Sequence, residues 1–448
     1  MNLEPIKYDP SSLCIIVSIF FLPLKHTLRS LFLWYNCNRK PILLLEVLLL
    51  IFTLQIAHSQ AVFRDILGKR NKVHLDFESH GHLILVSLKI KNRIPLNFIF
   101  DTGSAHTILF NKEVTDYLGI PYSDTVQIAG ADQSRILRTY VARNVPLQFG
   151  EGIRATRDIL VLEEDYFQLR RLLGVEVHGI LGMDLIKTLA IEINYKHHRI
   201  SIFRPTHLPK ITNSYSDYKL YFRQGKPYIK IPLYLNKSKR NPILAKLLID
   251  TGAGISMMLL NNSHPDIALP SKHIPGFIGS SLGGPVKGYL SRIREVSLGE
   301  IKYVQPPVYF QTLDSIRPNI SKANGLIGNR FLENYSIILD ESHQRLYLHP
   351  YSKKQPKYKL DRSGIQLYSM GPKLNKFIVA SVVPGSPADL AGILPGDQII
   401  KVGWHPVGWY GLDGLYELFS KKPGKKIKLK LLRNHQNIKV DFRLRDLI

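Results

Sequence analysis

A four-residue signature occurs twice in this 448-residue chain and limits the folds that it can adopt. The copies read Asp101-Thr102-Gly103-Ser104 and Asp250-Thr251-Gly252-Ala253, and each Asp ends an apolar run. An apolar run, a tight polar turn and another apolar run predict a strand, a turn and a strand at each copy. One Asp-Thr-Gly alone is a weak signal, because Asp and Gly are ordinary turn residues. The repetition is therefore the informative part.

A second shared element follows each signature at nearly the same distance. It reads His178-Gly179-Ile180-Leu181-Gly182 in the first copy and Asn324-Gly325-Leu326-Ile327-Gly328 in the second. Matches at several points in one register indicate a duplicated domain. We therefore predict two halves, residues 74–205 and 215–350, each of which contributes one Asp.

These motifs resemble those of the aspartic protease superfamily over roughly residues 74–350. The short halves and the lack of a flap tyrosine are closer to its retropepsin-like branch than to pepsin-like enzymes. The resemblance implies a mainly β fold, with two pseudo-symmetric β-barrel halves that form one acid protease unit. It also implies that Asp101 and Asp250 hydrolyse peptide bonds by holding water between an ionised general base and a protonated general acid. Two carboxyl groups about 3 Å apart share a proton, an effect for which aspartic proteases are the usual illustration.

The other motif residues are expected to support the two turns. Glycine lets a turn approach its partner half where a Cβ would obstruct. The resemblance assigns the threonines to hydrogen bonds between the turns and places the later glycines beneath them. These supporting residues are Thr102, Gly103, Ser104, Thr251, Gly252, Ala253, Gly182 and Gly328.

One asymmetry distinguishes the two signatures, since Ser104 carries a hydroxyl where Ala253 carries a methyl. A hydrogen-bond donor to a carboxylate favours the ionised form. We hypothesise that Asp101 is the more acidic member and that Asp250 usually holds the proton, although the pKa values belong to the pair.

The resemblance also requires a flap, a hairpin that closes over bound peptide and excludes water. The candidates lie between the two motifs of each half, at Gly130-Ala131-Asp132-Gln133-Ser134 and at Gly279-Ser280-Ser281-Leu282-Gly283-Gly284. An ordinary surface hairpin is the alternative for both.

A third domain is predicted at residues 360–447. The stretch from Pro384-Gly385-Ser386-Pro387 to Pro395-Gly396-Asp397 resembles PDZ domains of the bacterial protease-associated type. Such domains add a peptide as a strand and capture its terminal carboxylate with backbone amides. The resemblance maps these functions to Ser363-Gly364-Ile365-Gln366-Leu367, with Gln366 in place of the usual second glycine. The alternative role is packing that merely orders the protease.

The N-terminal residues 1–61 are predicted to be a signal sequence or a membrane anchor. Residues 41–57 are apolar, follow Arg39 and Lys40, and precede Ser59-Gln60-Ala61, which is typical of a cleaved secretory signal. The only cysteines, Cys14 and Cys37, precede that cleavage site. An exported chain without disulfides fits a bacterial cell envelope or periplasm better than an animal fluid.

The formal net charge of +25 raises the question of acidic partners. Residues 351–448 hold 18 Lys or Arg against 7 Asp or Glu, a difference of 11. Lysines alternate with apolar residues at 425–430, which is typical of a solvated sheet face. Because no nucleic-acid-binding motif accompanies them, we expect no nucleic acid and instead a weak attraction to an anionic membrane surface.

No metal site or cofactor is expected. The alternating His74, Asp76, Glu78, His80 and His82 would share one strand face, and a solvated face explains them. The sequence thus predicts an exported aspartic endopeptidase that acts on peptide or protein substrates and uses its PDZ domain to select them. The alternative is a catalytically silent envelope protein that binds peptides. Burying an acidic pair is costly, which favours the enzyme.

Overall fold

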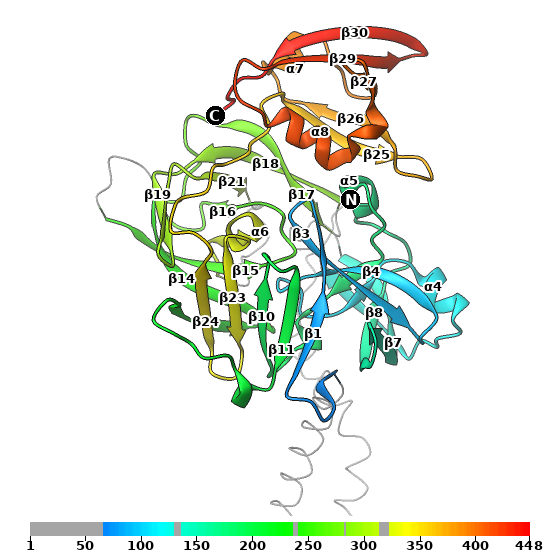
Figure 1. Ribbon diagram of the computed structural model, residues 1–448, viewed down its shortest axis with the longest axis vertical. Helices are drawn as coiled ribbons and strands as arrows, with labels where there is room; N and C mark the ends of the chain where they lie inside the picture. The colour runs from blue at the N-terminus through cyan, green and yellow to red at the C-terminus, as the bar shows by residue number, and fades with distance from the viewer. Residues whose placement is uncertain (1–65, 130–135, 236–240, 282–283, 313–321) are drawn as a thin grey trace, which may run out of the picture. The chain divides into compact units, whose positions relative to one another are not determined.

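The computed structural model describes residues 66–129, 136–235, 241–281, 284–312 and 322–448. These residues are mainly β, as predicted, and their strands form four sheets (Figure 1). None of the helices in these ranges is long and apolar enough to cross a membrane. The apolar run at residues 41–57 lies outside them.

The first half is built on a sheet with the strand order β2-β3-β4-β9-β5-β8-β7-β6. Strand β4 leads directly into the first signature, and its neighbour β9 carries the apolar residues that precede Gly182. The strand bounds are β2 Glu78–His80, β3 Leu83–Ile90, β4 Ile94–Phe100, β5 Ile108–Leu109, β6 Asp124–Ala129, β7 Ile136–Phe149, β8 Ile153–Val161 and β9 Gly179–Leu181.

The second half repeats this order strand for strand. Its sheet reads β13-β14-β15-β22-β16-β21-β18-β17, with β19 paired to β14 and β20 to β19. The bounds are β13 Tyr221–Arg223, β14 Lys226–Tyr234, β15 Ile243–Asp250, β16 Met257–Asn261, β17 Ile274–Ser281, β18 Gly284–Arg292, β19 Glu295–Leu298, β20 Ile301–Val304, β21 Pro307–Thr312 and β22 Gly325–Gly328. The duplication inferred from the motifs is therefore also a duplication of topology.

A shared six-stranded sheet joins the halves. Its order is β1-β11-β10-β23-β24-β12, so the innermost strand of each half pairs with the other, antiparallel, at the centre. The bounds are β1 Lys72–Asp76, β10 Ala190–Asn194, β11 Arg199–Phe203, β12 Ser216–Lys219, β23 Tyr335–Asp340 and β24 Arg345–Pro350.

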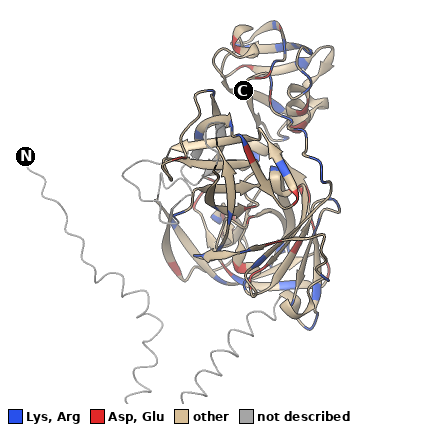
Figure 2. Ribbon diagram, turned by 90° about the vertical axis from the view of Figure 1, so that its left-hand side faces the viewer, with Lys and Arg blue, Asp and Glu red and all other residues tan. Residues whose placement is uncertain are grey.

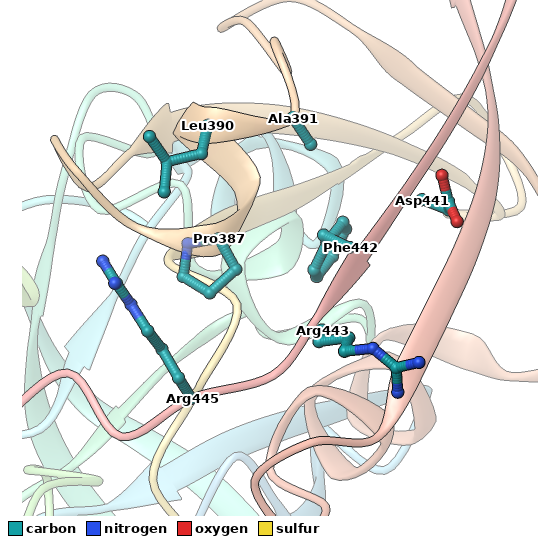
Figure 3. Close-up of a pocket in the computed structure, with 7 residues that line it drawn as sticks. All are labelled: Pro387, Leu390, Ala391, Asp441, Phe442, Arg443 and Arg445. Atoms are coloured by element: carbon teal, nitrogen blue, oxygen red, sulfur yellow. The ribbon is translucent and has the colours of Figure 1, made fainter.

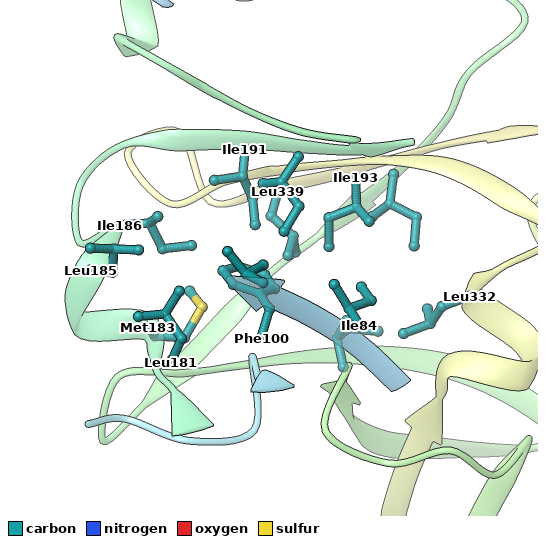
Figure 4. Close-up of a cluster of buried hydrophobic side chains, with 14 of the residues drawn as sticks. Ile84, Phe100, Leu181, Met183, Leu185, Ile186, Ile191, Ile193, Leu332 and Leu339 are labelled. Carbon is teal, nitrogen blue, oxygen red and sulfur yellow. The ribbon is translucent and has the colours of Figure 1, made fainter. Parts of the chain in front are cut away.

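One continuous hydrophobic core fills the space between these sheets. Phe100, the last residue before Asp101, is fully buried there, in one cluster with first-half residues such as Leu181 and second-half residues such as Leu339 (Figure 4). A fully buried aromatic side chain contributes on the order of 2–3 kcal/mol. This packing fixes the ends of the strands that carry the signatures.

The helices of residues 66–350 are short connections. Among the described residues they include α4 Lys112–Tyr117, α5 Leu169–Leu173 and α6 Asn329–Leu332, with single 3-10 turns at Met183–Leu185 and Pro205–His207. Asn111 caps α4, because its side chain accepts a hydrogen bond from the Glu113 N–H.

The C-terminal domain has its own sheet and its own hydrophobic core, as the predicted PDZ fold requires. The strand order is β25-β26-β27-β29-β30, and β28 pairs with β27. The bounds are β25 Ile365–Met370, β26 Lys376–Val382, α7 Pro387–Leu390, β27 Gln398–Val402, β28 His405–Pro406, the 3-10 turn Val407–Trp409, α8 Gly411–Phe419, β29 Lys426–Arg433 and β30 Gln436–Arg443. Strand β25 is at one edge of the sheet.

Candidate active site

The two aspartates lie at equivalent strand ends. In the first half β4 runs parallel to β9, and the backbone N–H of Asp101 donates to the carbonyl of Leu181 at 3.0 Å. In the second half β15 runs parallel to β22, with Asp250 opposite Gly328. The parallel neighbour thus holds each aspartate where its strand opens into the turn.

The structure brings the two aspartates together from the two halves. A Cβ placed on Gly103 would lie 2.7 Å from Cγ of Asp250, and one on Gly252 would lie 2.3 Å from Cγ of Asp101. Atoms cannot approach so closely without displacing the partner carboxyl, so both turns need glycine here. Each carboxylate also accepts a hydrogen bond from the glycine of its own turn, at 2.6 Å for Asp101 and 2.9 Å for Asp250.

The threonines tie the turns to each other. The Thr102 N–H donates to Thr251 Oγ1 at 3.0 Å, and the Thr251 N–H donates to Thr102 Oγ1 at 3.1 Å. Each hydroxyl then donates to the opposite strand, Thr102 to the carbonyl of Ile249 at 2.6 Å and Thr251 to that of Phe100 at 2.7 Å. Both threonines are fully buried. Four buried hydrogen bonds therefore join the halves directly under the carboxyl groups.

The later glycines pack under the turns. A Cβ on Gly182 would lie 2.5 Å from the His106 carbonyl carbon, and one on Gly328 would lie 2.3 Å from the Ile255 carbonyl oxygen. Both sites require a residue without a side chain.

Two residues that the sequence analysis missed follow these glycines closely. The Asp184 carboxylate accepts hydrogen bonds from the N–H and the hydroxyl of Thr107, at 2.9 and 2.8 Å. Asn329 donates through Nδ2 to the Thr251 carbonyl at 2.6 Å and accepts a hydrogen bond from the Tyr195 hydroxyl, also at 2.6 Å. Both residues closely follow the glycine motif that the two halves share, and this position in the sequence could have identified them.

Burial and mutual charge separate the acidities of the two aspartates. Burial raises the pKa of Asp101, while the Gly103 N–H, the Lys226 charge and a hydrogen bond with Asp250 offset part of that rise. Burial and the neighbouring Asp101 charge hold the pKa of Asp250 well above its usual range. The pKa of Asp250 is therefore raised more than that of Asp101, which is the order hypothesised from the sequence.

The hypothesis that a hydrogen bond from the Ser104 hydroxyl makes Asp101 the more acidic aspartate is wrong. The Ser104 hydroxyl donates to the carbonyl of His106 at 2.8 Å and not to the Asp101 carboxylate. The asymmetry comes instead from the charge and hydrogen bonding of the carboxyl pair, and from the Ser104 backbone, which lowers the pKa of Asp101.

A lysine near the two aspartates is a further difference between the two halves. Two hairpins with two-residue turns, β2–β3 and β13–β14, occupy matching positions in the halves. A Cβ on Gly225 in the second hairpin would lie 3.6 Å from Cβ of Ala105, directly after the first signature. Lys226 follows this turn, and its charge lowers the pKa of both Asp101 and Asp250. By strand register the first half has the buried Leu83 at this position.

The predicted flaps fall partly outside the described residues. Gly130, Ala131 and Asp132 lie outside them, as does Gly283. The flanking segments are antiparallel hairpins: Ala129 pairs with Ile136 between β6 and β7, and Ser281 pairs with Gly284 between β17 and β18. The described strands that flank each candidate are therefore paired with each other.

The predicted PDZ peptide site is already hydrogen-bonded within the domain. The N–H groups of Ser363 and Gly364 donate to the Asp361 carboxylate at 3.0 and 2.7 Å, and the Ile365 N–H donates to the Ser363 hydroxyl. Gln366 accepts a hydrogen bond from the Ser381 hydroxyl.

The strand edge at Leu367 is occupied as well. The Tyr416 hydroxyl of α8 accepts from the Leu367 N–H at 3.0 Å and donates to its carbonyl at 3.2 Å. Burial raises the pKa of Tyr416 to about 12, so the hydroxyl stays protonated at neutral pH. A peptide that added to β25 here would have to displace this side chain.

Two other features of the described residues do not form a catalytic site. A shallow groove between α7 and β30 is lined by apolar side chains with Arg443 and Arg445 beside them (Figure 3), and it has no pair of acidic groups. In the described ranges, no group of three or more His, Cys, Asp or Glu could hold a metal ion. The histidines noted in the sequence have other partners: His74 contacts Ser201 and His82 contacts Glu333.

Comparisons with known proteins agree with the predicted architecture. Residues 86–185 match the family model described as aspartyl protease, and residues 378–433 match the one described as PDZ domain. A 61-residue stretch is 41% identical to the carboxy-terminal processing protease CtpA of Bacillus subtilis (strain 168). That stretch covers 14% of this chain and 13% of the relative. The aspartyl protease and PDZ resemblances are thereby confirmed.

Proposed function

We propose that this chain is an exported aspartic endopeptidase whose catalytic pair is Asp101 and Asp250. The observation that carries the proposal is the close approach of two half-buried carboxyl groups, one from each half, whose pKa values are raised to different extents. Titratable groups whose surroundings separate their pKa values are suited to act as base and acid.

The same geometry supports different catalytic roles for the two aspartates. The ionised Asp101 accepts a proton from a water held between the carboxyl groups, while the protonated Asp250 donates a hydrogen bond to the scissile carbonyl oxygen. Attack of that water gives a tetrahedral intermediate, and proton transfer to the amine nitrogen releases the two peptide products. The threonine bonds keep both carboxyl groups in place, because small misplacements cost large factors in rate.

The PDZ domain is proposed to select substrates. Support comes from the domain match and from the likeness to a protease named for carboxy-terminal processing. Peptide addition at β25 requires the Tyr416 hydroxyl to leave Leu367. We expect Tyr416→Phe to bind peptides with a free carboxyl terminus more tightly than the parent, measured by fluorescence polarisation. Equal binding by both proteins would contradict a gating role for Tyr416.

Export rests on the sequence of residues 41–61 alone. We propose cleavage after Ala61 in a bacterial envelope, with a retained anchor as the alternative. Edman sequencing of the protein recovered from the periplasm distinguishes them, because cleavage gives Val62 as the first residue.

The test of catalysis is cleavage of casein from acid to neutral pH by residues 62–448, compared with the variants Asp101→Asn and Asp250→Asn. Loss of cleavage in both variants, together with inhibition by pepstatin, is the expected result. Activity that survives in either variant would overturn the catalytic pair. A parent without activity at any pH would favour the silent peptide-binding protein, and deletion of residues 352–448 would reveal a protease held inactive by its PDZ domain.

A further inference from the structure

Three lysines form a row across the sheet of the PDZ domain. Lys401 on β27 lies opposite Lys430 on β29, and Lys430 lies opposite Lys439 on β30. Residues directly opposite in neighbouring strands point to the same face, and like charges in such positions are destabilising. Within residues 351–448, which the structure describes without a gap, none of these lysines has a carboxylate partner. The fold therefore carries a row of charges that works against its own stability.

The rest of this face is also cationic. Along β29 the side chains of Ile427, Leu429 and Leu431 are buried, so the alternating lysines point to the opposite side. The face, which we call the lysine face, consists of Lys401, Lys426, Lys428, Lys430, Lys439 and Arg443, with Asp441 as its carboxylate. Asp441 pairs with Lys426. Figure 2 marks the Lys and Arg positions of the domain in blue.

Two exposed tryptophans follow β27, Trp404 in the turn between β27 and β28 and Trp409 in the 3-10 turn after β28. Trp404 is 92% exposed and Trp409 is 75% exposed. The Gly403 N–H donates to the Lys428 carbonyl at 2.8 Å, so the turn that carries Trp404 is beside the lysine face. The ring of Trp409 stacks on His405, with centroids 5.2 Å apart. Large apolar rings are normally buried, and two exposed together mark an interaction surface.

We propose that the lysine face and the two tryptophans form a docking surface for an anionic lipid membrane. Tryptophan is enriched at the membrane–water interface, where its ring lies among the headgroups. Lysine reaches anionic headgroups while its aliphatic part stays near apolar material. A cationic sheet face with exposed indoles in the neighbouring turns matches such a surface in charge and in chemistry. An anionic leaflet would also neutralise the unpaired row of Lys401, Lys430 and Lys439.

The face continues toward a second apolar feature. Arg443 belongs both to the lysine face and to the groove in Figure 3, which Pro387 and Phe442 also line. Leu390 at the same groove is 74% exposed. Arginines beside exposed apolar side chains extend the pattern expected of a membrane contact. Duplex nucleic acid would use the charges but has no need of the exposed leucine.

The test is cosedimentation with vesicles of phosphatidylcholine, with or without phosphatidylglycerol. It uses residues 63–448, which form a compact unit and lack the apolar N-terminal run. The triple variant K401Q/K430Q/K439Q is expected to bind anionic vesicles about a hundredfold more weakly, since each basic residue near an anionic surface contributes about fivefold. The double variant W404S/W409S is expected to lose about tenfold for each ring.

A second measurement separates docking from a structural role. Removing the like charges should raise the melting temperature of the triple variant while its vesicle binding falls, and a purely structural set of lysines would not give these opposite signs. Matched controls are Lys89→Gln and Tyr117→Ser, which alter an exposed lysine and a 78% exposed tyrosine of the first half and should leave binding unchanged. Equal binding to neutral and anionic vesicles, or tighter binding to duplex DNA than to anionic vesicles, would overturn the proposal. Neither result depends on proteolytic activity.

Discussion

Replacing Thr251 with valine tests whether the hydrogen bonds between the turns hold the two halves together. The Thr251 hydroxyl accepts from the Thr102 N–H at 3.0 Å and donates to the Phe100 carbonyl at 2.7 Å. Valine has nearly the same shape but has no polar atom at this position. The substitution therefore leaves two buried backbone groups without partners and creates almost no cavity.

The magnitude follows from those two groups. Each buried donor or acceptor left unpaired costs about 1–3 kcal/mol, so the variant should lose about 4 kcal/mol of unfolding free energy. Typical domains have only about 5–15 kcal/mol in total, so the effect is large but leaves a folded protein to measure. The turnover number should also fall, because Thr251 directly follows Asp250.

The assay is urea unfolding followed by circular dichroism, with casein cleavage measured on the same samples. Tryptophan fluorescence is unsuitable for the protease halves, because Trp404 and Trp409 both lie in the PDZ domain. The matched control is Thr139→Val, which removes a buried hydroxyl that makes one bond, to the Val126 carbonyl at 3.1 Å within the first half. A Thr251→Val protein that is no less stable and no less active than Thr139→Val would refute the role of these bonds.

The remaining predictions concern the carboxyl pair. Lys226→Met removes a charge that lowers both carboxyl pKa values, so both limbs of the pH–rate profile for casein cleavage should move to higher pH; a shift to lower pH would contradict this assignment. Asp250→Asn should raise the melting temperature at neutral pH. Because the pKa of Asp250 is raised in the folded protein, its carboxyl group lowers the stability of the fold as the pH rises above 3.8, the ordinary pKa of Asp. Asn cannot ionise, so the variant does not lose this stability. That gain should vanish in acid, and a gain that persists below this value would have another cause. Ser104→Ala should leave the pH–rate profile unmoved, since its hydroxyl donates to His106, and a displaced profile would restore the discarded hypothesis.

Much of the protease fold could be predicted because duplication leaves the same pattern twice. At Gly103 and Gly252 the opposite aspartate lies so close that no side chain fits, so only glycine is possible there. Such positions can be recognised as motifs in the sequence. The PDZ domain was equally accessible, because its Pro-Gly-Asp turn has a recognisable spacing in the sequence.

Contacts between distant segments could not be predicted. The hairpin of Lys226 approaches the first signature only after the two halves assemble, and no local pattern records that approach. The Tyr416 hydroxyl on Leu367 likewise depends on how a helix packs on a strand 49 positions away. The direction of the Ser104 hydroxyl was misjudged because sequence alone cannot choose between two nearby acceptors.

The fusion of both halves into one chain has a consequence for how a substrate enters. A site with perfect twofold symmetry would accept a peptide equally well in either chain direction. Here Lys226 is matched by Leu83, so the side chain near the carboxyl pair is charged in one half and apolar in the other. Under the proposed function, a peptide bound at the carboxyl pair would meet different neighbours on its amino-terminal and carboxy-terminal sides, and this difference would select one chain direction.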